Sequence, residues 1–157
     1  MEKVYGSAIR QDGITQVGKN YYVYFGFGKD NESDETGYNY RHKFDHKPTQ
    51  EEIREVIIEA INDETSQKIL TGFKHEEKTV YLSVENQLNY AHLNSSVTAS
   101  SSVTVKMSDS EGDDIFVDMT GAEFKAFYKK VLAFLNKCMQ ECWNNKKGLT
   151  LEDYSLE

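Results

Sequence analysis

The longest stretch of regular hydrophobic spacing covers residues 120–147 and predicts an amphipathic helix. Thr120 and Glu123 have the spacing of a capping box, in which the two side chains satisfy free backbone N–H groups of the first turn. Gly148 is a residue type that commonly ends a helix. Apolar side chains recur at steps of three and four residues, which predicts one buried face: Phe124, Phe127, Tyr128, Val131, Leu132, Leu135, Cys138, Met139, Cys142 and Trp143. We therefore expect this helix to supply a large share of the core.

The N-terminal region is rich in residues that favour strands. Residues 4–10, 21–27 and 38–44 predict a three-stranded antiparallel meander, with a turn at 18–20 and a polar loop at 29–35.

A helix should follow this sheet, because Thr49 and Glu52 form a second capping box after the only proline, Pro48. Its apolar stripe runs from Ile53 to Ile61, and the polar pair at residues 62–63 predicts its end.

The middle of the chain predicts a strand at residues 79–83 and a helix at 84–93 that Ser83 would cap. We expect this helix to bury Leu88 and Ala91. Two further strands, at 103–107 and 115–117, flank an acidic turn, and a Ser/Thr-rich tract at 94–102 predicts a loop or a ragged strand edge.

Together these elements predict an α+β fold. A small antiparallel N-terminal sheet with one helix would occupy residues 1–63. A strand–helix–hairpin–long helix module would occupy residues 69–149. Residues 150–157 would form a short acidic tail.

The chain has 157 residues, and its net charge of −8 argues against nucleic-acid binding, which needs clustered Lys and Arg. No apolar run is long enough to predict a membrane span. Cys138 and Cys142 share one helical face, where a disulfide would strain the helix, so we expect both to be reduced core residues.

Two clusters contain residue types that bind metal ions, but neither has the ligand spacing of a metal site. An acidic run resembles a calcium loop, but Gly112 is its fourth residue, whereas the EF-hand loop needs glycine at the sixth. His42 and His46 are four residues apart but lack further ligands at a suitable spacing. We therefore expect a solvated acidic turn and no metal ion.

Catalytic motifs are also missing from the sequence. Gly26 and Gly28 follow a strand, but the third glycine and the helix of a dinucleotide-binding loop are absent. The sequence contains no nucleophile elbow of the G-x-S-x-G type. We expect no catalytic residue, no cofactor and no enzymatic activity.

Aromatic side chains are the best candidates for an interaction surface, because tyrosine is enriched at protein contacts. Alternation along residues 21–27 places Tyr22 and Tyr24 on one face, which we expect to be extended by Tyr38 and Tyr40. Phe134 widens the apolar stripe of the long helix, which would then need a partner on a second side. Both features favour a homo-oligomer.

Several motifs follow one another in residues 69–149. They are a strand with the start Leu82, Ser83, Glu85, Asn86 and Gln87, a strand bearing Lys106, an aromatic strand with Phe116, and the cap Thr120 before the long helix. With these motifs, residues 69–149 resemble a small domain of unknown function from tailed bacteriophages and prophages, where it often ends tail-fibre-associated or other virion proteins.

The resemblance implies a non-enzymatic structural or adaptor component of a phage particle, attached to a fibre, tail or capsid. An alternative is a tail-fibre assembly factor, a chaperone absent from the mature virion. Its partners would be other phage structural proteins and further copies of itself, with a trimer favoured by analogy with fibres. It would reside in the virion, and in the host cytoplasm during assembly, without contacting nucleic acid or membrane.

Overall fold

The computed structural model describes residues 1–156 and divides into two compact units. The first unit combines residues 1–61 with the C-terminal residues from 146 onward, and the second unit comprises residues 62–145. The chain is 42% helical and 29% strand, which confirms the predicted α+β fold. Within the described part, no helix has the length and hydropathy needed to cross a membrane.

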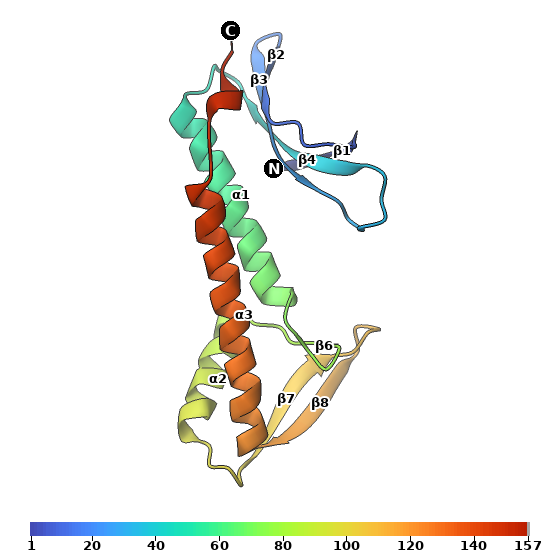
Figure 1. The fold of residues 1–157 in the computed structure, drawn as a ribbon, viewed down its shortest axis with the longest axis vertical. Coiled ribbons are helices and arrows are strands. Elements are labelled where there is room, and N and C mark those ends of the chain that lie inside the picture. The colour runs from blue at the N-terminus through green and yellow to red at the C-terminus, as the bar shows by residue number, and fades with distance from the viewer. Residues whose placement is uncertain (157) are drawn as a thin grey trace. The chain divides into compact units, whose positions relative to one another are not determined.

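A four-stranded antiparallel sheet forms most of the first unit (Figure 1). Its strands are β1 (Glu2–Ser7), β2 (Gly13–Val17), β3 (Asn20–Gly28) and β4 (Gly37–Phe44), arranged in the order β1-β4-β3-β2. The prediction of three strands was wrong because it missed β2. This strand has only five residues, and its last three are exposed, so no apolar alternation marks it.

The first strand also ends earlier than expected, at Ser7. The pairing register between β1 and β4 shifts between Tyr5 and Ser7, and the intervening Gly6 has φ 108°. This irregularity interrupts the regular ladder before Arg10.

Helix α1 (Gln50–Thr71) begins with the predicted capping box, in which the Glu52 amide donates to Thr49 Oγ1 at 3.2 Å. The helix does not end near residues 62–63 but continues to Thr71. Asn and Asp cost a helix only a fraction of a kcal/mol relative to alanine, roughly up to 0.7, and no glycine or proline occurs before Gly72. The boundary between the two units falls within this helix.

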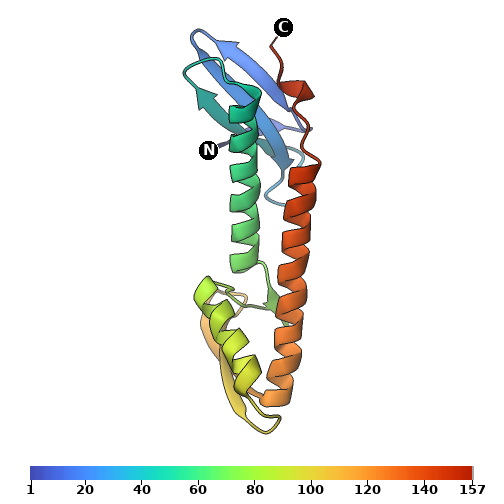
Figure 2. The same cartoon turned by 90° about the vertical axis from the view of Figure 1, so that its left-hand side faces the viewer.

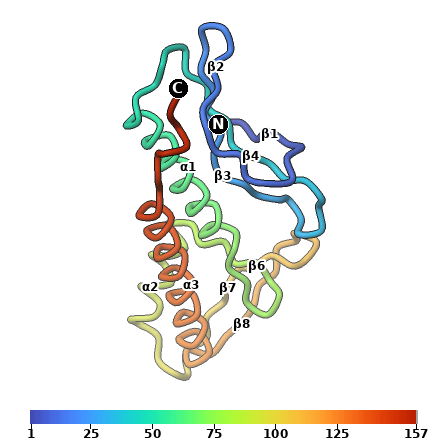
Figure 3. Tube along the Cα trace, turned by 45° about the horizontal axis from the view of Figure 1, so that its top comes forward, coloured from blue at the N-terminus to red at the C-terminus, as the bar shows by residue number. Residues whose placement is uncertain are grey.

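The core of the first unit lies between one face of the sheet and the first part of α1. It contains Val23, Phe25, Ile53, Ile57, Ala60 and Tyr154. Tyr154, in the short 3-10 helix η1 (Glu152–Tyr154), is only 5% exposed. Figure 3 shows this C-terminal segment beside the sheet of the same unit. Residues 150–156 therefore do not form a separate tail, because they supply a core side chain.

The second unit contains a second antiparallel sheet in the order β5-β6-β7-β8, together with α2 and α3. Its elements are β5 (Lys74–His75), β6 (Lys78–Thr79), α2 (Val84–Ser96), β7 (Ser102–Ser108), β8 (Asp114–Thr120) and α3 (Gly121–Lys147).

The strand predicted at residues 79–83 ends after Thr79. The amide of Val80 donates to the Phe73 carbonyl at 2.9 Å, and the amide of Leu82 donates to the Leu70 carbonyl at 3.1 Å. The segment after Thr79 has no ladder pairing with β7, while Val80 and Leu82 stay buried.

Helix α2 has the predicted cap, since the Asn86 amide donates to Ser83 Oγ at 3.2 Å, but its buried face was predicted wrongly. Leu88 is 66% exposed, and Ala91 is exposed as well. The buried residue is Tyr90, whose ring lies 6.0 Å from that of Phe124 and 5.5 Å from that of Phe127. A tyrosine ring facing two phenylalanines buries more apolar area than leucine and alanine would.

Helix α3 supplies a large share of this core, as the sequence predicted, through Phe124, Phe127 and Val131. Leu132 and Trp143, which were expected on the buried face, are exposed. Its buried residues include Phe124, Phe127, Val131, Cys138 and Cys142. The capping box at its start is also present, with the Glu123 amide 3.2 Å from Thr120 Oγ1.

Candidate interaction surfaces

Tyr22 and Tyr24 lie on the face of the first sheet opposite the core residues Val23 and Phe25. Tyr24 pairs with Arg41 across β3 and β4, and the Arg41 guanidinium carbon lies 5.2 Å from the centre of the Tyr22 ring. Arg41 also forms an ion pair with Glu2 at 2.6 Å, and this carboxylate raises the pKa of the guanidinium. This face therefore presents two half-buried tyrosines around the Arg41 guanidinium, which is already paired with Glu2.

Tyr38 and Tyr40 lie on the other face of the sheet, so the expected patch of four tyrosines does not form. Tyr40 pairs with Phe25, and the ring of Tyr38 lies 5.5 Å from that of Tyr40. The β3–β4 register places even-numbered residues of β3 opposite odd-numbered residues of β4 up to Phe25. Because directly opposed residues share a face, this parity separates the two pairs of tyrosines.

Phe134 contributes less free surface than expected, because it is half-buried against the core of the second unit. Its ring lies 5.4 Å from that of Phe73.

The apolar residues that α3 exposes are instead Leu132, at 42%, and Trp143, at 53%. Met139 is half-buried between them. At 3.6 residues per turn, spacings of seven and then four residues keep all three within a narrow line along the helix. We call Leu132, Met139 and Trp143 the outer line of α3.

A groove of about 630 Å³ separates α2 from β7 in the second unit. Figure 2 shows α2 in front of the β7–β8 hairpin of the same unit. One wall consists of Tyr81 and of residues of α2: Asn86, Asn89, Tyr90, His92 and Leu93. The other wall is formed by β7: Thr104, Val105 and Lys106.

The sequence did not predict this groove. The helical spacing of Asn86, Asn89 and Leu93 could have indicated a shared face of α2. The opposite wall depends on where β6 leaves β7, which no local pattern encodes.

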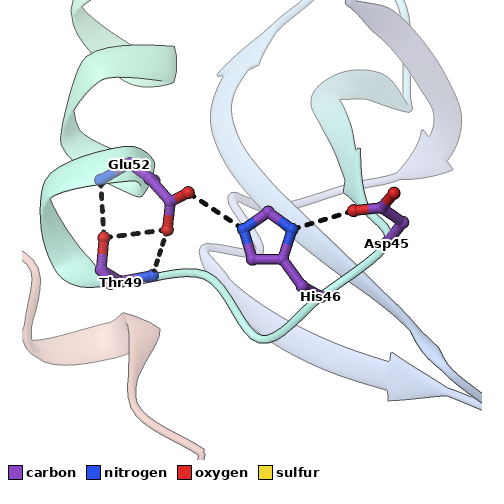
Figure 4. A network of polar contacts seen from close by, with 4 residues as sticks. All are labelled: Asp45, His46, Thr49 and Glu52. Atoms are coloured by element: carbon purple, nitrogen blue, oxygen red, sulfur yellow. Dashed lines mark hydrogen bonds and ion pairs between the residues drawn. The ribbon is translucent and has the colours of Figure 1, made fainter.

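A polar network surrounds the start of α1 (Figure 4). The two ring nitrogens of His46 contact Asp45 Oδ1 at 2.8 Å and Glu52 Oε1 at 2.9 Å. The second oxygen of Glu52 accepts hydrogen bonds from the Thr49 amide at 2.7 Å and from its hydroxyl at 2.9 Å. The Asp45 and Glu52 carboxylates raise the pKa of His46, and bonds from Thr49 and His46 lower the pKa of Glu52 to about 2.

This network predicts a pH-dependent contribution to stability. The pKa of His46 in the folded state lies above its ordinary value of 6.5. Protonated His46 therefore stabilises the folded state fully below pH 6.5, and this contribution is lost as the pH rises through the folded-state pKa. Glu52 stays ionised in this range. His46→Gln should therefore lower the thermal midpoint at about pH 5.5 and leave it unchanged at about pH 8.5. His92→Gln, at an exposed position of α2, is the control, and an equal effect of His46→Gln at both pH values would contradict the prediction.

His42, His75 and the acidic turn at residues 109–114 do not form a network of this kind. Burial lowers the pKa of His42 and of His75, whose rings lie 4.7 Å from Phe44 and 5.1 Å from Phe127. In the turn, Asp109 Oδ1 accepts hydrogen bonds from the amides of residues 111 and 113, both at 2.9 Å. Across residues 1–156, no three His, Cys, Asp or Glu side chains gather as metal ligands.

Cys138 and Cys142 are buried and free. Burial raises the pKa of the Cys138 thiol, which disfavours the nucleophilic thiolate.

Comparison with known proteins gives a family for the chain. No curated protein and no solved structure matches it. The family described as a domain of unknown function (DUF4376) matches residues 52–156. Because this match covers more than half of the sequence, the chain belongs to the DUF4376 family.

Proposed function

We propose that this chain is a non-enzymatic structural or adaptor component of a tailed-bacteriophage particle, attached to a fibre, tail or capsid, and that it self-associates through α3. The observation that carries the proposal is the outer line of α3. It places two large exposed apolar side chains and one half-buried one along a single side of the longest helix.

Self-association would remove this line from water. Leu132, Met139 and Trp143 have the seven- and four-residue spacing with which helices pack along their length. Tryptophan is also the side chain most enriched at the energetic centre of protein interfaces. Copies related by closed symmetry would bury the same line in every subunit.

The phage assignment rests on the resemblance of residues 69–149 to virion-associated domains. Fibres of such particles favour a trimer by analogy, and other virion proteins would be the remaining partners. Both ring nitrogens of His46 are bonded to carboxylates, and the pKa of the Cys138 thiol is raised. These two observations fit a binding role better than acid–base or nucleophilic catalysis.

Light scattering after size exclusion tests self-association of the full chain at micromolar concentration. We expect a multiple of the monomer mass, and Trp143→Glu or Leu132→Glu should return the chain to the monomer with an unchanged circular dichroism spectrum. Val84→Glu, at a position of α2 that is 73% exposed, is the matched control and should leave the assembly intact. A monomer at every concentration would contradict self-association.

Quantitative mass spectrometry of purified particles of a phage that encodes this chain tests the assignment to the virion. Several copies per particle are expected. Presence in the infected host cytoplasm, together with absence from purified particles, would favour an assembly factor instead.

A further inference from the structure

One edge of β7 is left almost entirely without a partner strand. On one side β7 pairs with β8 along its whole length, from Ser102 opposite Thr120 to Ser108 opposite Asp114. On the other side β6 reaches only Ser108, which pairs with Thr79. Within residues 1–156, no strand pairs with that edge between Ser102 and Met107.

The groove between α2 and β7 runs along this edge. Side chains of a strand alternate between its two faces, so a cavity on one face touches every second residue. This groove touches three consecutive residues, Thr104, Val105 and Lys106, and no residue of β8. It therefore follows the backbone edge opposite β8, where every second residue directs its N–H and C=O groups outward.

Two features keep the edge open. The ladder between β6 and β7 ends at Thr79 and Ser108, and in the segment that follows the amides of Val80 and Leu82 bond to the Phe73 and Leu70 carbonyls, on the side away from β7. Helix α2 is anchored through Tyr90 to Phe124 and Phe127 of α3, and it leaves the groove between itself and the strand. Natural sheets usually cover or shorten such an edge.

We propose that this groove is a binding site for an extended segment of a partner protein, which adds to the sheet as a strand along Ser102–Met107. Peptides bind open sheet edges in this way through main-chain hydrogen bonds, with side-chain pockets providing selectivity. The site rests on the second unit alone and does not depend on self-association through α3.

The lining of the groove defines the chemistry of the segment. The chain carries 26 acidic residues against 18 basic ones, yet no acidic side chain lines this groove. Its basic residues are His92 and Lys106, and the Lys106 ammonium is ion-paired with Asp114 of β8 at 2.7 Å. A neutral or acidic segment therefore suits it best. The half-buried Leu93 provides an apolar contact for one of its alternate side chains, and Asn89 adds a polar group on the same helical wall.

The outer edge of β8 is a weaker candidate. The cavity beside it has a volume of only about 290 Å³, less than half that of the groove beside β7. Its lining has three carboxylates, Glu76, Asp118 and Glu123, against one lysine, Lys130, so it suits an acidic segment less well.

The experiment selects a displayed library of random peptides of about eight residues against the immobilised full chain. Binding of the selected peptides is then measured for two single-residue variants of α2. Asn89→Trp fills the groove from its helical wall and should weaken binding about tenfold or more. Leu88→Trp, on the neighbouring exposed position outside the groove, should leave binding within about twofold. Amide exchange should slow in β7 and not in β8 when a selected peptide binds.

Three outcomes would overturn the proposal. The library yields no binder, or Asn89→Trp and Leu88→Trp affect binding equally, or the protection appears in β8. Exchange of the free chain at two concentrations tests a second copy as the occupant. If protection of β7 rises with concentration, the edge pairs with another copy and not with a separate protein.

Discussion

Replacing Phe127 with alanine is expected to lower the free energy of unfolding of the second unit by about 3–5 kcal/mol. Phe127 is 1% exposed, and its ring lies within 6.0 Å of the rings of Phe73, Tyr90 and Phe124. Removal of the ring leaves a cavity among large side chains that are anchored on α2, on α3 and in the connection between α1 and β5. These neighbours cannot all move inward, so the lost contacts add to the lost transfer free energy.

Native-state hydrogen exchange of the β7 and β8 amides measures this effect, because it reports the second unit separately. Phe116→Ala is the matched control, since Phe116 is 69% exposed and should change stability by less than about 0.5 kcal/mol. Equal losses from the two variants would mean that the core has been assigned to the wrong ring.

Replacing Tyr154 with alanine should destabilise the first unit by about 3 kcal/mol, near the lower end for a buried aromatic residue. The side chain is 5% exposed and packs in the core that contains Val23, Phe25 and Ile57. Burial and the nearby Asp12 carboxylate raise the pKa of its phenol, so the hydroxyl stays protonated at neutral pH.

Exchange of the β3 amides should accelerate in this variant, with the amides of β7 as an internal reference. Tyr5→Ala, at a position that is 60% exposed, is the control for loss of a tyrosine from the same unit. Unchanged β3 exchange in Tyr154→Ala would show that the C-terminal segment adds nothing to this core.

The starts of the helices could be predicted because they depend on residues close in sequence. Each start has a hydrogen bond between residues three positions apart: the amides of Glu52, Asn86 and Glu123 donate to the hydroxyls of Thr49, Ser83 and Thr120, respectively. The end of α1 could not be predicted in the same way. Nothing local stops the helix at residues 62–63, and the small propensity costs there are outweighed by continued packing.

The faces of the elements required tertiary information. Periodicity alone did not distinguish Leu88 from Tyr90 as the buried residue of α2, because the choice depends on two phenylalanines of α3. Tyr22 and Tyr40 were assigned to one surface because the β3–β4 register, which the hairpin fixes, is not visible in either strand. The groove beside β7 depends in turn on where the ladder between β6 and β7 ends, at Thr79 and Ser108.

The division of the first unit between the two ends of the chain has a consequence for biosynthesis. A ribosome emits the N-terminal sheet and the start of α1 first, yet the core of that unit also needs Tyr154. The second unit is continuous, and its last residue is translated before Tyr154. The domain made first is therefore completed last, and a nascent chain halted after the second unit would carry a first sheet that still lacks one of its core side chains.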